Sequence, residues 1–199
     1  ISTVLAAFMG GLALGSWRLG TRADRSPSPL RLYAALEVGI GILGAAVPAL
    51  VVAVKPLYVG LAHVLPEAAM APVRIVVAFA LLLLPTALMG GTLPVLGRFL
   101  VRESDRLGRG IGLLYAVNTL GAVVGAFLAG FVLIPALGLL PCIAVAVGGN
   151  LVAAGAALAI ERRLGSAARL GDKRADARPA PGQPPAAARP AAGRPGSAR

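Results

Sequence analysis

Five runs of roughly 20 residues contain almost no charged side chains, and they constrain the fold more than any other feature. A helix needs roughly 20 residues to cross the hydrocarbon core of a bilayer, which is about 30 Å thick. The runs lack the period-two alternation of membrane β-barrel strands, and backbone groups in lipid must otherwise be satisfied within a helix. The sequence therefore predicts an all-α, polytopic integral membrane helix bundle, with spans at about residues 1–17, 33–54, 75–97, 110–134 and 141–160.

Composition and the scarcity of Cys and His exclude several classes of protein. Hydrophobic residues make up 57% of the chain and charged residues 14%, which excludes a soluble domain with one packed core. One Cys (Cys142) and one His (His63) leave no disulfide framework and no His/Cys zinc site. The paired carboxylates Glu103 and Asp105 lie among arginines and are typical of a solvated loop. We therefore predict no catalytic residue, no metal site and no cofactor in this chain.

The positions of the basic residues predict how the helices cross the membrane. Of the 19 Lys and Arg residues, all but Lys55 and Arg74 lie after the first, third or fifth span. Because Lys and Arg collect on the cytoplasmic side, we expect a multi-pass inner (plasma) membrane protein with a cytoplasmic C-terminus. If the parent protein starts in the cytoplasm, an odd number of spans, most simply one, precedes Ile1. Cys142 is then expected to react with a membrane-impermeant maleimide from outside.

Composition divides the chain into a transmembrane domain, residues 1–163, and a basic tail, residues 164–199. The tail is rich in Ala, Pro and Arg and has no apolar periodicity, so we expect it to be disordered. Basic juxtamembrane segments lie against anionic lipid, which makes the lipid bilayer the expected partner. Nucleic acid is disfavoured because the tail has no aromatic side chain on which bases can stack.

Three polar side chains within the predicted spans are candidates for a functional site. Glu37 is the one carboxylate in any span, and acids inside a membrane are functional candidates by default. It lies early in its span, so the alternative is a snorkelling side chain that pairs with Arg18 or Arg31. Asn118 and Asn150 are amides in the fourth and fifth spans. For these two, the alternative to a substrate site is an interhelical hydrogen bond.

Glycines four residues apart predict where helices approach one another closely, because a residue without a side chain lets backbones meet. Such pairs occur in the first and fourth spans, at Gly11 and Gly15 and at Gly121 and Gly125. On this basis the fourth span is the best candidate for a tightly buried helix. The segment GIGILG (39–44) matches a dinucleotide-binding fingerprint but lies mid-membrane without the required acidic residue, so it too indicates helix packing.

The connection after the first span contains Gly20, Asp24 and Arg25 in the spacing Gly-x-x-x-Asp-Arg. It resembles a loop of the major facilitator superfamily, in which the acid and neighbouring bases form a charge network that closes the cytoplasmic face. The basic run that usually follows is replaced here by SPSPLR. The alternative is a solvated turn that obeys the positive-inside rule.

Similarity to a known family is carried by four segments: STVLAAFMGGLALGSW, PLRLYAALEVGIG, LLLLPTALMGGTLPVLGR and, above all, GRGIGLLYAVNTLGAVVGAFLAGFVLIPALGL. They resemble the transmembrane region of fused spermidine synthase-like membrane proteins, over residues 1–163. In that family a block of membrane helices precedes a cytoplasmic Rossmann-like aminopropyltransferase domain, and the first span here corresponds to the second helix. Residues 164–199 do not match that domain, so no catalytic residue is carried over.

The resemblance implies the membrane-embedded part of a spermidine synthase-like protein, acting as an anchor or as a transporter-like module. For the passage of a small cationic or hydrophobic metabolite, the candidate residues are Asp24, Arg25, Glu37, Asn118 and Asn150. One alternative is a free-standing small-solute transporter half that works as a homo-oligomer. The others are an inert anchor and an enzyme whose catalytic domain is a separate chain.

Overall fold

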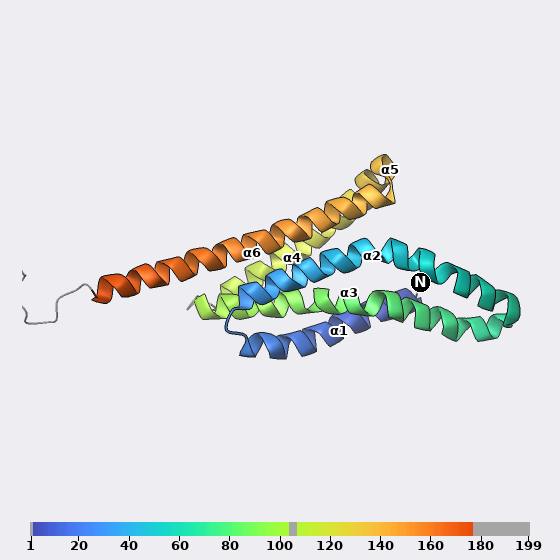
Figure 1. Ribbon diagram of the computed structural model, residues 1–199, viewed down its shortest axis with the longest axis horizontal. Helices are drawn as coiled ribbons and strands as arrows, with labels where there is room; N and C mark the ends of the chain where they lie inside the picture. Colours follow the sequence, from blue (N-terminus) through green and yellow to red (C-terminus); the bar gives the residue numbers. More distant parts are fainter. Residues whose placement is uncertain (1, 104–106, 177–199) are drawn as a thin grey trace, which may run out of the picture. The chain divides into compact units, whose positions relative to one another are not determined.

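The computed structural model describes residues 2–103 and 107–176. In this part of the chain every regular element is a helix, which confirms the predicted all-α fold. Residues 1–161 form one compact unit and residues 162–199 a second. The elements are α1 (Ser2–Arg25), α2 (Pro29–Val64), α3 (Glu67–Glu103), α4 (Leu107–Phe127), the π-helix η1 (Leu128–Leu133), α5 (Ile134–Leu137) and α6 (Leu139–Asp176) (Figure 1).

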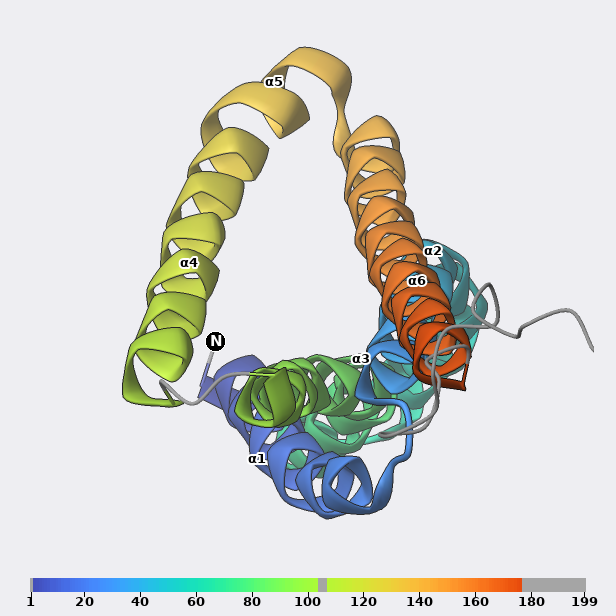
Figure 2. The same cartoon turned by 90° about the vertical axis from the view of Figure 1, so that its left-hand side faces the viewer.

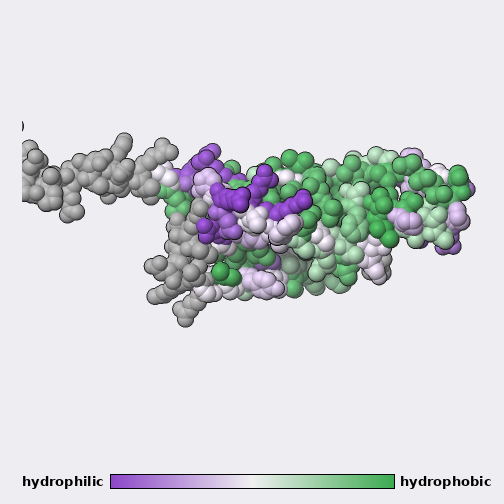
Figure 3. All heavy atoms as spheres, turned by 90° about the horizontal axis from the view of Figure 1, so that it is seen from below, coloured by the Kyte–Doolittle hydropathy of each residue, from purple (hydrophilic) through white to green (hydrophobic). Residues whose placement is uncertain are grey.

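Four helices are long and apolar enough to cross a membrane: Pro29–Val64, Glu67–Leu100, Gly110–Leu137 and Leu139–Ser166. They contain the second to fifth predicted spans, and the chain is therefore a polytopic membrane helix bundle. Figure 3 shows a largely apolar face, with strongly polar residues gathered toward one end. α1 contains the first predicted span but is not among the four, because Arg18 and several small residues lower its mean hydropathy. A membrane-crossing role for α1 stays a prediction.

α2 and α3 are each longer than a bilayer is thick. α2 has 36 residues and α3 has 37. This corresponds to about 54 Å of helix against about 30 Å of hydrocarbon. Residues 55–74, which we name the hairpin tip, contain the turn between the two helices and reach beyond α5 in Figure 1. Within the tip, Nε of Arg74 donates a hydrogen bond to the Tyr58 hydroxyl at 3.1 Å.

Glycines hold α1 and α3 in close contact. Gly11 and Gly15 of α1 face α3, and a side chain at Gly15 would overlap the backbone of Ala87. Gly90 of α3 faces the α1 backbone in the same way. Across this interface the Ser16 hydroxyl donates a hydrogen bond to the Gly90 carbonyl oxygen at 2.8 Å. The first glycine pair of the sequence therefore lies where two helix backbones meet.

The second glycine pair has no helix against it. A methyl group added at Gly121 or Gly125 would meet nothing within 4 Å, and none of the described residues of α4 is buried. The prediction of a tightly buried fourth span is therefore wrong for the described chain. The reason is that α4 packs on α3 while α6 stands apart from it, the two being joined through η1 and α5 (Figure 2). A glycine pair brings helices together only where a second helix faces it.

Small buried clusters join the remaining helices. One connects α2 to α6 and consists of Leu30, Ala34, Ala154 and Ala157. The other connects α1, α2 and α3 and consists of Ala23, Leu36 and Val95. Most of these side chains are small, so the helices approach closely, as is usual where the surrounding lipid is as apolar as the helix surface.

The chain reverses direction at Gly138, between α5 and α6. Gly138 has a φ of 85°, a left-handed conformation that residues with a side chain adopt only with strain. α6 begins at Leu139, earlier than the predicted span, so Cys142 lies in its first turn and is only 8% exposed. The thiol is therefore poorly accessible, and the reaction of Cys142 with an impermeant maleimide stays a prediction.

α6 continues beyond the predicted transmembrane domain to Asp176. Residues 164–176, which the sequence predicts to be disordered, are therefore helical. Ala, Leu and Arg are frequent in this segment and have high helix propensities, and lengthening an existing helix requires no new nucleus. The rest of the predicted tail, residues 177–199, lies outside the described residues.

Candidate functional site

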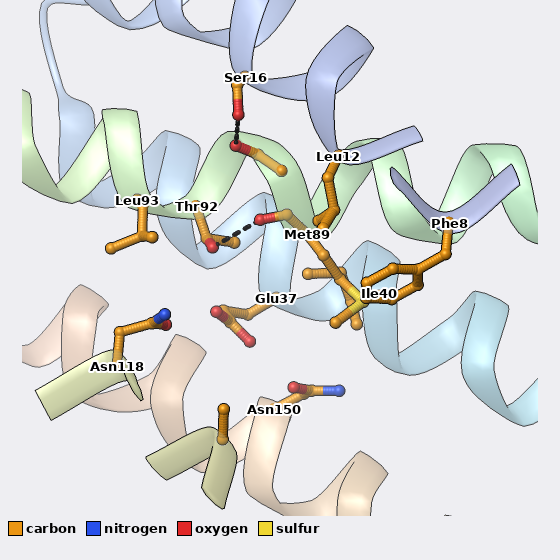
Figure 4. Close-up of a pocket in the computed structure, with 12 residues that line it drawn as sticks. Phe8, Leu12, Ser16, Glu37, Ile40, Met89, Thr92, Leu93, Asn118 and Asn150 are labelled. Carbon is orange, nitrogen blue, oxygen red and sulfur yellow. Dashed lines mark hydrogen bonds between the residues drawn. The ribbon is translucent and has the colours of Figure 1, made fainter. Parts of the chain in front are cut away.

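A pocket of about 470 Å³ lies among α1, α2, α3, α4 and α6, within the first compact unit. Because five helices contribute to it, the pocket depends on the assembled bundle (Figure 4). Its volume lies in the range of small-molecule sites, roughly 300–1,000 Å³. The polar side chains that line it are Ser16, Glu37, Thr92, Asn118 and Asn150.

Glu37 supplies the one ionisable group in the lining, and its side chain is buried. The residue is 8% exposed and lies in the third turn of α2, about 12 Å along the helix from Pro29. Tyr33, one turn earlier on α2, is the neighbour whose hydroxyl interacts with its carboxylate. In Figure 4 the carboxylate lies in the middle of the pocket and points away from the α2 backbone.

Glu37 does not pair with Arg18 or Arg31, the two partners that the sequence offered as an alternative. Arg31 instead pairs with Glu161 of α6, with Nε and Oε1 3.0 Å apart. Among the described residues, neither ion pair includes Glu37 or Arg18. A buried carboxylate without a cation is costly, so its environment must either protonate it or hold a positively charged group against it.

Asn118 and Asn150 join Glu37 in the same pocket. They come from α4 and α6, and Figure 4 shows their amides on the side of the pocket opposite α1. Three of the five candidates named from the sequence therefore converge, although they are separated by dozens of residues along the chain. The signal was an acid or an amide in each of three apolar spans, which does not by itself show that the residues face one another.

Sequence reasoning missed the contribution of α1. Phe8, Leu12 and Ser16 are spaced four residues apart and form a stripe that lines the pocket. Ser16 is held by its hydrogen bond to the Gly90 carbonyl oxygen. On α3, the Thr92 hydroxyl donates to the Met89 carbonyl oxygen at 2.8 Å. The four-residue spacing in α1 was a detectable signal, but it is equally typical of any helix face that packs.

Asp24 and Arg25 lie outside the pocket. Asp24 is at the end of α1, with Oδ1 3.7 Å from Nε of Arg98 near the end of α3. The Asp24 side chain is 71% exposed, and Arg25 is also exposed. The predicted charge network is thus represented by one ion pair between α1 and α3. Arg98, which the sequence places in a loop, belongs to the helix.

Two interhelical ion pairs therefore occupy the helix ends next to basic connections. Asp24–Arg98 joins α1 to α3, and Arg31–Glu161 joins α2 to α6. Both contain one exposed partner, and exposed ion pairs are worth only about 0–1 kcal/mol each. They can be broken at little cost, so they position the helix ends without locking them.

The pocket offers groups that bind a small molecule. Amide and carboxylate oxygens orient a polar or positively charged group, while Phe8, Leu12 and Ile40 contact an apolar body. In the described residues there is no group of three His, Cys, Asp or Glu that could hold a metal ion. Comparison of the chain with protein-family models, curated proteins and solved structures gave no match.

Proposed function

We propose that this chain is the membrane module of a spermidine synthase-like protein and that it passes a small solute across the plasma membrane. The observation that carries the proposal is the buried Glu37, placed with Asn118 and Asn150 in one pocket of an otherwise apolar bundle. A helix bundle that serves only as an anchor gains nothing from a buried acid, which costs stability unless it has a partner.

The two weak ion pairs support a role that requires movement. A transporter must open its pocket to each side in turn, and contacts at the closed end must break in every cycle. Asp24–Arg98 and Arg31–Glu161 each bridge two different helices at such an end. Their exposure keeps the cost of breaking them low.

Uptake into proteoliposomes tests the proposed function. We expect that one of three radiolabelled probes, tetramethylammonium, mannitol or succinate, enters faster than into protein-free vesicles. Glu37→Gln should lower that uptake by about 10-fold or more, because an interaction with a charged group is worth about 1.5–3 kcal/mol. Glu67→Gln, an exposed acid in the first turn of α3, is the matched control and should leave uptake unchanged.

Uptake of none of the three probes would contradict the proposed function and favour an inert anchor. Uptake that Glu37→Gln does not alter would remove the pocket from the pathway.

Orientation in the membrane is a separate part of the proposal. We assign the basic connections and the C-terminus to the cytoplasm. These segments contain 17 of the 19 Lys and Arg residues, and basic residues collect on the cytoplasmic side. In a Cys142→Ala background, His63→Cys at the exposed hairpin tip should react with an impermeant maleimide in intact cells. Ser26→Cys, between α1 and α2, should react only after permeabilisation. The reverse result would contradict the proposed orientation.

A homo-oligomeric transporter half is the second candidate function. The exposed face of α4, which includes Gly121 and Gly125, favours it. Gly-x-x-x-Gly faces let two membrane helices approach closely, so this face fits a helix of a second copy. Asn118 and Ala122, which line the pocket, lie on the same face of α4 as Gly121 and Gly125, so in that arrangement the second copy borders the pocket.

A further inference from the structure

The pocket contains one ionisable side chain and otherwise only neutral groups. α1 presents Phe8, Leu12 and Ser16, and α3 presents Met89, Gly90, Thr92 and Leu93. From α4 come Asn118 and Ala122, and from α6 comes Asn150. On α2 itself the ionisable neighbour is Tyr33, whose hydroxyl interacts with the Glu37 carboxylate. Among the described residues, no Lys, Arg or His lines the pocket with Glu37.

A buried carboxylate without a basic side chain beside it is either protonated or neutralised by a bound cation. Leaving a bare negative charge in a low-dielectric interior costs several kcal/mol even after relaxation. Protonation removes that cost, and so does a positive charge brought in by a ligand. The two solutions exclude each other, because one carboxylate cannot both keep its proton and attract a cation.

From this we infer that the pocket binds a small organic ammonium ion in exchange for the proton on Glu37. The inference rests on the proposed function and gives its solute class and its coupling. On binding, the O–H bond of the Glu37 carboxyl breaks and one proton passes to water. The ammonium ion then neutralises the carboxylate, so the charge within the pocket is unchanged.

The lining favours an organic cation over a bare metal ion. Calcium takes six to eight oxygen ligands, and magnesium needs near-ideal octahedral geometry. The pocket offers one carboxylate, two amides and two hydroxyls spread over a volume of about 470 Å³. A metal ion would leave most of that volume empty. An ammonium ion that carries alkyl groups also contacts the apolar side chains of Phe8, Leu12 and Met89.

Each polar group then has a distinct part in binding. Glu37 provides the charge, and the hydroxyl of the neighbouring Tyr33 can donate to the carboxylate after its proton has left. Asn118 and Asn150 line the same pocket, and their carbonyl oxygens can turn the negative ends of the amide dipoles toward the cation. Phe8 adds an aromatic ring to the lining, and aromatic rings also attract cations.

Proton release measured together with binding tests the inference. Tetramethylammonium is the probe because it carries a permanent charge and has no proton of its own to lose. Added to the purified full chain in weakly buffered detergent solution, it should release about one proton for each ion bound, as linkage requires. Its affinity should rise about 10-fold per pH unit while the empty carboxyl is protonated, and level off once it is ionised.

Glu37→Gln should abolish both binding and proton release, whereas Glu67→Gln should retain both. The fold of each variant is checked by its elution from a sizing column. The infrared carbonyl band of a protonated carboxylic acid provides a second measurement. It should be present in the empty wild-type protein, disappear on addition of the probe, and be absent from Glu37→Gln.

The outcomes separate this inference from the proposed function. Binding of tetramethylammonium without proton release would overturn the exchange but leave a solute pocket. Binding of mannitol or succinate alone would overturn the solute class and still support passage of a solute. Proton release that persists in Glu37→Gln would overturn the assignment to Glu37. Failure of all three probes to bind or to enter vesicles would overturn the proposed function itself.

Discussion

Gly15→Leu is expected to separate α1 from α3 and to destabilise the bundle by about 3 kcal/mol, the upper end of what overpacking usually costs. A side chain at Gly15 would meet the backbone of Ala87, which cannot move without shifting α3. The far end of a flexible neighbour could turn away, but a helix backbone cannot. Thermal unfolding in detergent, followed by helical circular dichroism, measures the effect.

Gly10→Leu is the matched control for that prediction. Gly10 lies on the same helix, and a side chain there would meet nothing within 4 Å. Both substitutions replace Gly by Leu inside the same helix and therefore raise helix propensity by the same amount, so the difference between them isolates the packing contribution. Equal melting temperatures for the two variants would contradict close contact between α1 and α3.

Ala122→Phe is expected to block the pocket and to lower solute uptake by about 10-fold or more, because forcing a solute past an added ring costs at least about 1–3 kcal/mol. Ala122 lines the pocket from α4 and is exposed within the described chain. The ring therefore enters the pocket without disturbing a buried cluster. The melting temperature should stay within a few degrees of wild type.

Ala126→Phe provides the comparison, since it places the same ring one turn further along α4 and outside the pocket lining. It should retain wild-type uptake. Equal uptake by both variants would show that solute does not pass through the pocket. A loss in both would instead indicate that α4 tolerates no bulk on this face.

The membrane helices were predictable because their signal is local. A run of apolar residues must become a helix in lipid, whatever its neighbours are, and four such runs lie in α2, α3, α4 and α6. The helix ends were less predictable. α6 extends to Asp176 because good helix formers continue past the apolar segment, and a search for uncharged runs does not detect this.

The individual residues of the site were predictable from the sequence, but their arrangement was not. Glu37, Asn118 and Asn150 stand out one by one as polar residues in apolar spans, and their convergence depends on how the helices rotate against one another. The same applies to the glycine pairs. Gly11 and Gly15 meet α3, whereas Gly121 and Gly125 face no helix in the described chain, although the two patterns are identical in sequence. Choosing between candidate partners such as Arg31 likewise requires the packed structure.

The excess length of α2 and α3 has a mechanical consequence. Each helix connects the hairpin tip to the pocket, where α2 supplies Glu37 and α3 supplies Thr92. Prolines lie on the way, at Pro48 and Pro56 in α2 and at Pro85 in α3. From Glu37 to Val64 the distance along α2 is about 40 Å. Proline lacks the N–H of a helix hydrogen bond and is the usual place where a helix bends. The length of α2 from Glu37 to Val64 therefore contains two positions, Pro48 and Pro56, at which the helix can bend.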